Sequence, residues 1–264
     1  MSGIYDEPDL YQLACAYRDV PAEVNALLAW CAEHWQGGTD RQAGSVLELA
    51  AGPAEHAREL AARGLSAAAL DLSAAMCAYA ARQAEAAGIA LDVHEADMRD
   101  FAIARQFDLA IIMLNSACHL FTLDDLVANL RAVAAHVVPG GLYVIELAHP
   151  ADYLSPDSRT SNTWTIESDS VVADVTWGGA ADRINPVTQV TREHMSITAR
   201  YSDGTIRTAS DMVPNRFWSA TEMTAAIRLA GGFSVAAAYG DFDDSTTLED
   251  KAAWRMILVL RRTP

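Results

Sequence analysis

The chain has 264 residues, of which 51% are hydrophobic and 20% are charged. This balance excludes an extended disordered chain and predicts one large globular domain, or a domain with a substantial insertion. Lysine and arginine together number 19 against 35 aspartates and glutamates, a formal charge of −16. Because phosphate backbones attract basic surfaces, this charge argues against a nucleic acid as a partner.

The sequence carries no mark of secretion or membrane insertion. Its first ten residues are polar and acidic, and no run of about eighteen apolar residues occurs. The cysteines are widely spaced and form no CxxC pair, which favours buried thiols over a zinc ribbon or a disulfide framework. They are Cys15, Cys31, Cys77 and Cys118. We therefore expect a cytoplasmic protein without a membrane partner.

Short apolar runs and longer periodic stretches alternate through the first half of the chain. Up to about Gly38, helical spacing of apolar residues predicts one or two lead helices. The apolar runs that follow predict strands at Val46–Ala50, Ala67–Leu70, Leu91–Val93, Leu109–Leu114 and Leu142–Leu147. The Ala-rich stretches predict helices at Ala54–Arg63, Ala74–Ala87 and Asp124–Val138. This alternation is typical of a parallel sheet covered on both faces.

The residue composition and the pattern of apolar residues change after His149-Pro150. Residues 163–212 are rich in Thr, Val, Ser and Trp, which predicts an antiparallel β-meander with a hairpin turn at Asp203-Gly204. A helix at Ala220–Leu229 follows and ends at Gly231-Gly232. The final strands, Phe233–Tyr239 and Trp254–Leu260, are joined by an acidic loop too short for a crossover helix, so we expect them to pair antiparallel.

The expected fold class is therefore α/β. It is a Rossmann-like, mostly parallel seven-stranded sheet with a reversed last strand, N-terminal helices and an inserted antiparallel β-meander. We assign residues 1–148 and 216–264 to the Rossmann-like domain with its lead helices, and residues 149–215 to the β-rich insertion.

The strongest local motif is Val46-Leu47-Glu48-Leu49-Ala50-Ala51-Gly52-Pro53-Ala54. An apolar strand here leads into a tight turn of small residues and then into a helix. Small residues let a nucleotide approach the backbone, and a helix N-terminus offers free N–H groups. A plain packing turn would look the same, so this motif alone is not specific.

Two acidic positions follow at the ends of the next two strands. Asp71 lies about twenty residues beyond the turn, where a carboxylate can accept hydrogen bonds from both ribose hydroxyls. Further on, Asp97 could accept from an adenine amino group while Met98 packs on the ring. Either acid could instead serve a turn or a helix cap, as could Ser73. All three motifs fall at the carboxyl ends of adjacent strands, where open α/β sheets bind ligands.

With these motifs the sequence resembles the class I S-adenosylmethionine-dependent methyltransferases. Glu48-Leu49-Ala50-Ala51-Gly52 stands for the family's glycine-rich first motif, Asp71 for its ribose-binding acid and Asp97-Met98 for its adenine contact. Phe107 to Ser116 resembles its fourth strand, and Val138-Pro139-Gly140-Gly141-Leu142 the entry to its fifth. The resemblance implies a site for S-adenosylmethionine, with S-adenosylhomocysteine as product. The implied cofactor residues are Tyr11, Glu48, Ala50, Gly52, Asp71, Leu72, Met76, Ala96, Asp97, Met98, Leu114 and Asn115.

The first motif departs from the family pattern in having alanine at positions 50 and 54, where glycine is usual. If either position requires a positive φ, alanine costs on the order of 1 kcal/mol. The motif also discriminates against NAD, because dinucleotide binders need G-x-G-x-x-G for close contact with a pyrophosphate. Here Gly52 alone of those glycines is present, which favours S-adenosylmethionine.

Methyl transfer requires an aligned nucleophile and a group that manages one proton. His119 follows the fourth strand and is our candidate base, because an imidazole titrates near neutrality. The segment Tyr17 to Glu23 is similar to the lead helix of amino-sugar N-methyltransferases, a likeness that implies a catalytic role for Tyr17. Tyr11 could lie by the methionine end of the cofactor. Ordinary packing is the alternative for each of the three.

The β-rich insertion is expected to shape the acceptor pocket. Its candidate substrate-binding residues are His149, Tyr153, Arg216 and Trp218. Aromatic side chains in a meander are also common core residues. His149 and Asp152 resemble a minimal metal pair, but no third ligand accompanies them, so we expect no metal.

The predicted function is S-adenosylmethionine-dependent methylation of N or O in a small metabolite or natural product. The partner is a small-molecule methyl acceptor, and the lead helices and the insertion could both supply a homodimer face. Two alternatives stay open: a nicotinamide-dependent reductase, and a catalytically silent protein that binds S-adenosylmethionine.

Overall fold

The structure is a computed structural model that describes residues 3–36, 43–154, 162–179 and 181–264. It divides into two compact units. The Rossmann-like unit consists of Val20–Pro150 and Trp218–Pro264, and the sheet unit of Met1–Asp19 and Ala151–Phe217.

The Rossmann-like unit is built on a seven-stranded sheet in the part of the chain that is described. Its strands are β1 (Ser45–Leu49), β2 (Ser66–Asp71), β3 (Leu91–Glu95), β4 (Phe107–Ile112), β5 (Val137–Ala148), β10 (Phe233–Tyr239) and β11 (Arg255–Arg262). They lie in the order β10-β11-β5-β4-β1-β2-β3. Strand β11 runs antiparallel to both of its neighbours, which confirms the predicted reversed last strand.

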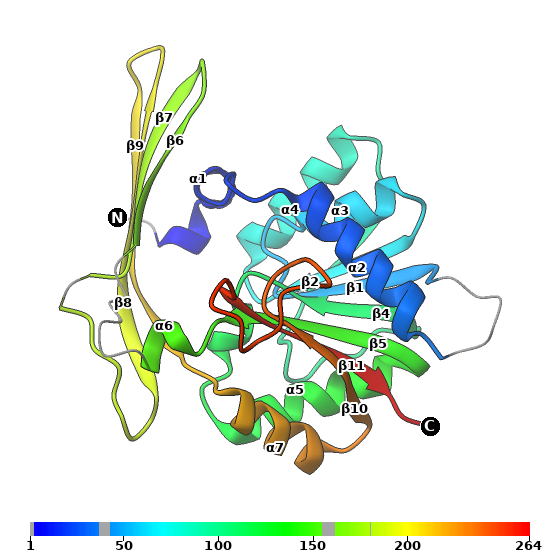
Figure 1. Cartoon of the computed structure of the whole chain (residues 1–264). Coiled ribbons are helices and arrows are strands. Elements are labelled where there is room, and N and C mark those ends of the chain that lie inside the picture. Colours follow the sequence, from blue (N-terminus) through cyan, green and yellow to red (C-terminus); the bar gives the residue numbers. More distant parts are fainter. Residues whose placement is uncertain (1–2, 37–42, 155–161, 180) are drawn as a thin grey trace. The chain divides into compact units, whose positions relative to one another are not determined.

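Helices cover both faces of this sheet (Figure 1). On one face lie α2 (Val20–His34), α3 (Glu55–Ala62) and α4 (Ala74–Ala86), and on the other lie α5 (Leu123–His136) and α7 (Ala220–Ala230). Successive strand residues point to opposite faces, so Val46 packs in one core cluster and Leu47 in the other. This two-sided burial explains why the strands appear in the sequence as nearly continuous apolar runs.

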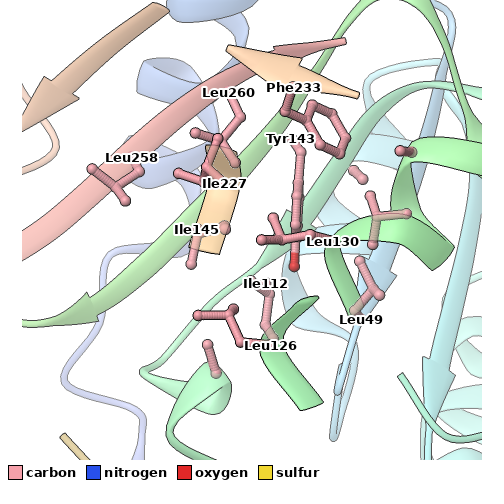
Figure 2. Packing of buried hydrophobic residues seen from close by; sticks show 14 of the residues in the cluster. Leu49, Ile112, Leu126, Leu130, Tyr143, Ile145, Ile227, Phe233, Leu258 and Leu260 are labelled. Atoms are coloured by element: carbon pink, nitrogen blue, oxygen red, sulfur yellow. The ribbon is translucent and has the colours of Figure 1, made fainter. Parts of the chain in front are cut away.

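The α5–α7 face holds a core of aliphatic side chains around Tyr143 and Phe233 (Figure 2). The ring centroids of these two residues lie 5.8 Å apart. The expected helix end at Val138 was two residues late. Helix α5 ends at His136, and β5 already begins at Val137.

The chain order of the sheet creates a switch point at β1. This strand pairs in parallel with β2 on one side and with β4 on the other. The loops that follow β1, β2 and β4 therefore leave the same edge of the sheet in different directions. Open α/β sheets bind their ligands at such an edge.

The sheet unit contains the predicted antiparallel meander. Its strands are β6 (Asn162–Glu167), β7 (Val171–Trp177), β8 (Val190–Tyr201) and β9 (Ile206–Arg216), accompanied by η1 (Ile4–Asp6), α1 (Pro8–Ala14) and α6 (Ala151–Leu154). The β8–β9 hairpin turns at Asp203-Gly204, as expected, with Gly204 at φ 88°. Gly231, at φ 68°, ends α7 in the other unit as predicted.

The segment Met1–Asp19 belongs to the same compact unit as the meander. The domain boundaries expected from the sequence place this segment in the Rossmann-like domain instead. Ile4 and Leu10 are buried in the apolar core of the sheet unit. The indole Nε1 of Trp164 donates to the carbonyl of Ala14 at 2.9 Å. Arg207 forms ion pairs with Glu7 and Asp9. Only α2 of the expected lead helices packs in the Rossmann-like unit.

Two further features concern membrane spans and cysteines. None of the helices in the described ranges is long and apolar enough to cross a bilayer. All four cysteines are buried and outside any disulfide, as predicted.

Candidate active site

The turn that joins β1 to α3 is held in a left-handed conformation at three positions. Ala50, Gly52 and Ala54 have φ angles of 47°, 52° and 54°. For an L-residue other than glycine this conformation costs about 1–2 kcal/mol. The two alanines that depart from the glycine pattern therefore occupy the strained positions, and the strain falls on the turn expected to meet the cofactor.

We expect Ala50→Gly to raise the free energy of unfolding by about 0.5–1 kcal/mol. Glycine adopts a positive φ without the Cβ clash, although its greater freedom in the unfolded chain offsets part of the gain. Urea denaturation measures the change. Ala51→Gly is the matched control, because Ala51 is not among the positive-φ residues and should lose stability instead. A loss of stability in Ala50→Gly would contradict the strain assigned to this turn.

Asp71 ends β2 and joins two turns through its carboxylate. Its Oδ2 accepts from the backbone N–H of Gly52 at 2.7 Å, and its Oδ1 accepts from that of Ser73 at 2.8 Å. Burial raises the pKa of the Asp71 carboxyl, and these N–H groups partly oppose the shift. Each oxygen keeps a further lone pair, so the carboxylate can still accept from two hydroxyls. Of the two candidate caps for α4, Asp71 and Ser73, it is Ser73 that caps the helix. Its Oγ accepts from the backbone N–H of Met76.

The loop after β3 is fixed by charge and by a buried amide. Asp97 accepts from the backbone N–H of Arg99 at 2.8 Å and pairs with its guanidinium at 2.6 Å. This guanidinium holds the pKa of Asp97 below its ordinary value and also pairs with Asp125 on α5 at 2.8 Å. The turn role left open for Asp97 is therefore present. If Asp97 also accepts a hydrogen bond from the adenine amino group, its carboxylate must do so while it is paired with Arg99.

Met98 is positioned by α5 and β5. Its carbonyl accepts from Asn129 Nδ2 at 2.9 Å, and Asn129 Oδ1 accepts from the buried Tyr143 hydroxyl at 2.9 Å. These contacts with α5 and β5 fix the backbone of the loop that follows β3. Sequence patterns alone do not reveal them, because the partners lie 31 and 14 residues apart.

The turn after β4 is also left-handed, at two consecutive non-glycine residues. Leu114 and Asn115 have φ angles of 54° and 60°. The N–H of Leu114 donates to Glu146 Oε2 at 2.8 Å, and Asn115 Oδ1 accepts from the N–H of Ala148 at 3.0 Å. Glu146 also lies 3.1 Å from Arg255 Nε. Sequence reasoning missed Glu146, although an acid inside the apolar run Leu142–Leu147 was a usable signal.

Glu146→Gln is expected to lower the free energy of unfolding by about 2 kcal/mol. An amide oxygen can still accept from Leu114, but the mostly buried Arg255 guanidinium loses its counter-charge. Thermal and urea unfolding measure the loss. Asp174→Asn removes an exposed partner of Arg200 and should change stability by less than about 1 kcal/mol. Equal losses in the two variants would contradict the role of burial here.

Glu48 lies beneath the β1–α3 turn in a buried ionic cluster. Its Oε2 accepts from the N–H of Ala57 at 2.7 Å, and its Oε1 lies 3.3 Å from His56 Nδ1. The other ring nitrogen of His56 lies 2.7 Å from Glu23 Oε2 on α2. Glu48 was predicted to bind cofactor, and both of its oxygens already contact protein. His56 and Glu23 were not identified from the sequence.

The other residues predicted in this unit differ in placement. Leu72 is 71% exposed beside Asp71, whereas Met76 is 1% exposed and is a buried core residue of α4. Ala96, like Met98, is half-buried against the core. Trp218 is 2% exposed inside the same core, which is the packing alternative weighed for it.

The two predicted histidines of this unit follow the strands β4 and β5. His119 ends the short η2 helix (Ser116–His119), and its ring centroid lies 6.4 Å from that of Phe121. His149 follows β5, and its Nε2 lies 2.9 Å from the carbonyl oxygen of Leu248. Catalytic or acceptor roles for both stay predictions.

Four predicted residues belong to the sheet unit, where they contact aromatic or polar neighbours. Tyr11 lies 5.7 Å from Tyr5 between ring centroids, Tyr17 lies 5.6 Å from Trp164, and Tyr153 lies 4.9 Å from Phe217. Arg216 donates to Gln189 at 3.1 Å. Their roles toward cofactor and acceptor stay predictions. Over the described residues, no group of three or more His, Cys, Asp or Glu side chains could hold a metal ion.

Comparison with known proteins finds a matching family, sequence relatives and solved structures of similar fold. Residues 46–141 match the methyltransferase domain family. A 105-residue segment is 39% identical to dTDP-3-amino-3,6-dideoxy-alpha-D-glucopyranose N,N-dimethyltransferase of Streptomyces fradiae. This segment covers 40% of this chain and 40% of that relative.

Solved structures match nearly the whole chain in fold. Streptomyces venezuelae DesVI has a TM-score of 0.79 at 21% identity, over 97% of this chain and 98% of that one. The sugar N-methyltransferase KedS8 from Streptoalloteichus has a TM-score of 0.74 at 24% identity, over 100% and 94%. Residues 46–141 therefore carry a methyltransferase domain, a 105-residue segment is similar to a sugar N,N-dimethyltransferase, and nearly the whole chain shares the fold of a solved sugar N-methyltransferase.

Proposed function

We propose that this chain transfers methyl groups from S-adenosylmethionine to the amino group of a nucleotide-linked amino sugar. The observation that carries the proposal is the Asp71 carboxylate, which holds Gly52 and keeps lone pairs for two hydroxyls. The relative from Streptomyces fradiae methylates an amino sugar according to its name. The segment that contains this turn lies within the residues that match the methyltransferase domain family.

The residues around the turn fit an adenosyl group. The Asp71 carboxylate would accept the ribose hydroxyls, the Gly52 turn would admit the methionine portion, and Leu72 offers an exposed apolar side chain beside the ribose. Met98 stands in the loop expected at the adenine. S-adenosylmethionine, when bound, supplies a sulfonium methyl that a nucleophile can displace.

The chain's own residues must then orient an amine and remove its proton. An ammonium has no lone pair, so the acceptor nitrogen must be deprotonated before it attacks. His119 is the proposed base, and Tyr17 the proposed partner that orients the amine. His149, Tyr153 and Arg216 are proposed to contact the acceptor. The relative's name includes a second methylation, so the site is also expected to accept a mono-methylated amine.

Mass spectrometry of dTDP-3-amino-3,6-dideoxyglucose incubated with the protein and S-adenosylmethionine tests this function. We expect one and then two methyl groups to be added. The analogue with a hydroxyl at the same carbon is the control and should stay unmodified. Methylation of the hydroxyl analogue alone would overturn the N-methyltransferase assignment, and modification of neither would favour a silent S-adenosylmethionine-binding protein.

The reductase alternative predicts a different ligand. S-adenosylhomocysteine should raise the melting temperature of the protein, whereas NAD and NADP should not. Stabilisation by NAD and not by S-adenosylhomocysteine would favour the reductase. A homodimer and a cytoplasmic location stay predictions. Light scattering after gel filtration tests the first, and imaging of a tagged chain in its host tests the second.

A further inference from the structure

His56 has a carboxylate at each ring nitrogen, in the interior of the Rossmann-like unit. Its Nε2 lies 2.7 Å from Glu23 Oε2, and its Nδ1 lies 3.3 Å from Glu48 Oε1. All three side chains are buried. A neutral imidazole carries one N–H, whereas an imidazolium carries two. Two acceptors at opposite nitrogens therefore select the imidazolium, which lies between two glutamate side chains.

The charges that face His56 come from two elements, α2 and β1. Burial alone would lower the pKa of His56, but the hydrogen bonds with Glu23 on α2 and Glu48 on β1 overcome it and raise the pKa to about 9. Burial raises the pKa of the Asp71 carboxyl on β2, and the charge of Glu48 adds to this shift. The cluster is thus electrostatically connected to the residue expected to hold the ribose.

The same cluster spans the two ends of the strained turn. Glu48 lies two residues before Ala50, and its Oε2 binds the N–H of Ala57 in the first turn of α3. His56 lies two residues after Ala54 and holds the other carboxylate oxygen of Glu48. These contacts connect the end of β1 to the start of α3, so the two ends of the turn formed by residues 50–54 are held together. Such a closure can maintain a left-handed turn against its intrinsic cost.

We propose that His56, as an imidazolium between Glu23 and Glu48, is a positioning residue that holds the Ala50–Ala54 turn in the shape that binds the cofactor. This inference rests on the proposed function, because it assumes that the turn meets S-adenosylmethionine. It assigns to α2, through Glu23, a contribution to cofactor affinity without any contact to the cofactor.

Calorimetric titration with S-adenosylhomocysteine tests the inference in the full chain. We expect His56→Gln to raise the dissociation constant at least about tenfold, since a neutral amide supplies no positive charge and both of its N–H donors lie on one nitrogen. The effect should be non-additive with Glu48→Gln, so that the double variant binds about as weakly as the worse single variant. His34→Gln is the matched control: His34 is also on α2 and hydrogen-bonded, to the Tyr239 hydroxyl at 2.8 Å, but it lies outside the cluster. It should leave the dissociation constant within about twofold of wild type.

Glu23→Gln covers the case in which His56→Gln does not fold. The amide oxygen of this variant can still accept from His56 Nε2, so the protein should fold. The affinity for S-adenosylhomocysteine should fall several-fold, because His56 loses one of its two negative partners. If the folded variants lose stability but bind S-adenosylhomocysteine within twofold of wild type, His56 is merely structural and the inference is overturned. If wild type itself does not bind S-adenosylhomocysteine, the proposed function fails, and the inference fails with it.

Discussion

Replacing Asp71 with alanine is expected to weaken S-adenosylhomocysteine binding at least about a hundredfold. Two hydrogen bonds from ribose hydroxyls to a carboxylate contribute about 1.5–3 kcal/mol each, and each 1.4 kcal/mol is a tenfold change in affinity. The substitution also frees the N–H groups of Gly52 and Ser73, so the first turn loses its tie to β2. Isothermal titration of the purified variant measures the loss.

The control for Asp71 is an acid on the neighbouring strand. Asp92 on β3 is about half exposed and pairs with His94 at 3.0 Å. Asp92→Asn should change the affinity by less than about twofold. If Asp71→Ala keeps near wild-type affinity while folded, the ribose site lies elsewhere and the assignment of the β2 acid is wrong.

The free energy of unfolding is expected to fall by about 3 kcal/mol between pH 6.5 and pH 9.5 because of His56. Its pKa rises from an unfolded value near 6.5 to about 9 in the folded protein. Below pH 6.5 both states are protonated, so the stabilisation is fully present. As the pH rises through about 9 the folded imidazolium loses its proton and the stabilisation is lost. A shift of one pKa unit corresponds to about 1.4 kcal/mol.

Urea denaturation of wild type and His56→Gln across this range isolates the effect. At pH 6.5 the variant should be less stable by about 3–5 kcal/mol, because two buried carboxylates then lack their counter-charge. The gap between the two proteins should narrow as the pH approaches 9.5. A gap that stays constant over the whole range would show that His56 is neutral in the folded protein.

Much of the fold follows from patterns that are local in sequence. The apolar runs of β1, β2 and β4 are buried on both faces, so they are distinctive even without alignment. The acidic loop before β11 is too short for a crossover helix, and it correctly predicts the reversed strand. Element ends are less well determined. Strand β5 begins at Val137 because Pro139 and the glycines after it are accommodated in the strand.

The candidate site was predictable where its residues follow strands and hidden where they depend on distant partners. Asp71 lies at a strand end, and the structure joins it to Gly52. The Leu114-Asn115 turn depends on Glu146, 32 residues away from Leu114, and a local pattern cannot show that contact. The pairing of His56 with Glu23, 33 residues apart, is hidden for the same reason.

The N-terminal segment shows a limit of reading helices by spacing. Its apolar periodicity predicted helices but not the surface that they cover. Trp164 and Arg207 fix α1 and the preceding Glu7 to the meander, and each lies about 150 or more residues from its partner in the chain. Met76 and Trp218 show a related limit. The sequence does not tell whether a large apolar side chain near a motif contacts a ligand or packs in the core. Met76 and Trp218 are both buried in the core.

A crystal structure of the protein with S-adenosylhomocysteine tests the central claim most directly, namely that the strand ends of β1, β2 and β3 hold one adenosyl group. The account predicts ribose hydroxyls on Asp71, the methionine portion along the Gly52 turn and the adenine beside Met98. A ligand bound in any other place, or strand ends that contact no part of it, would contradict the account.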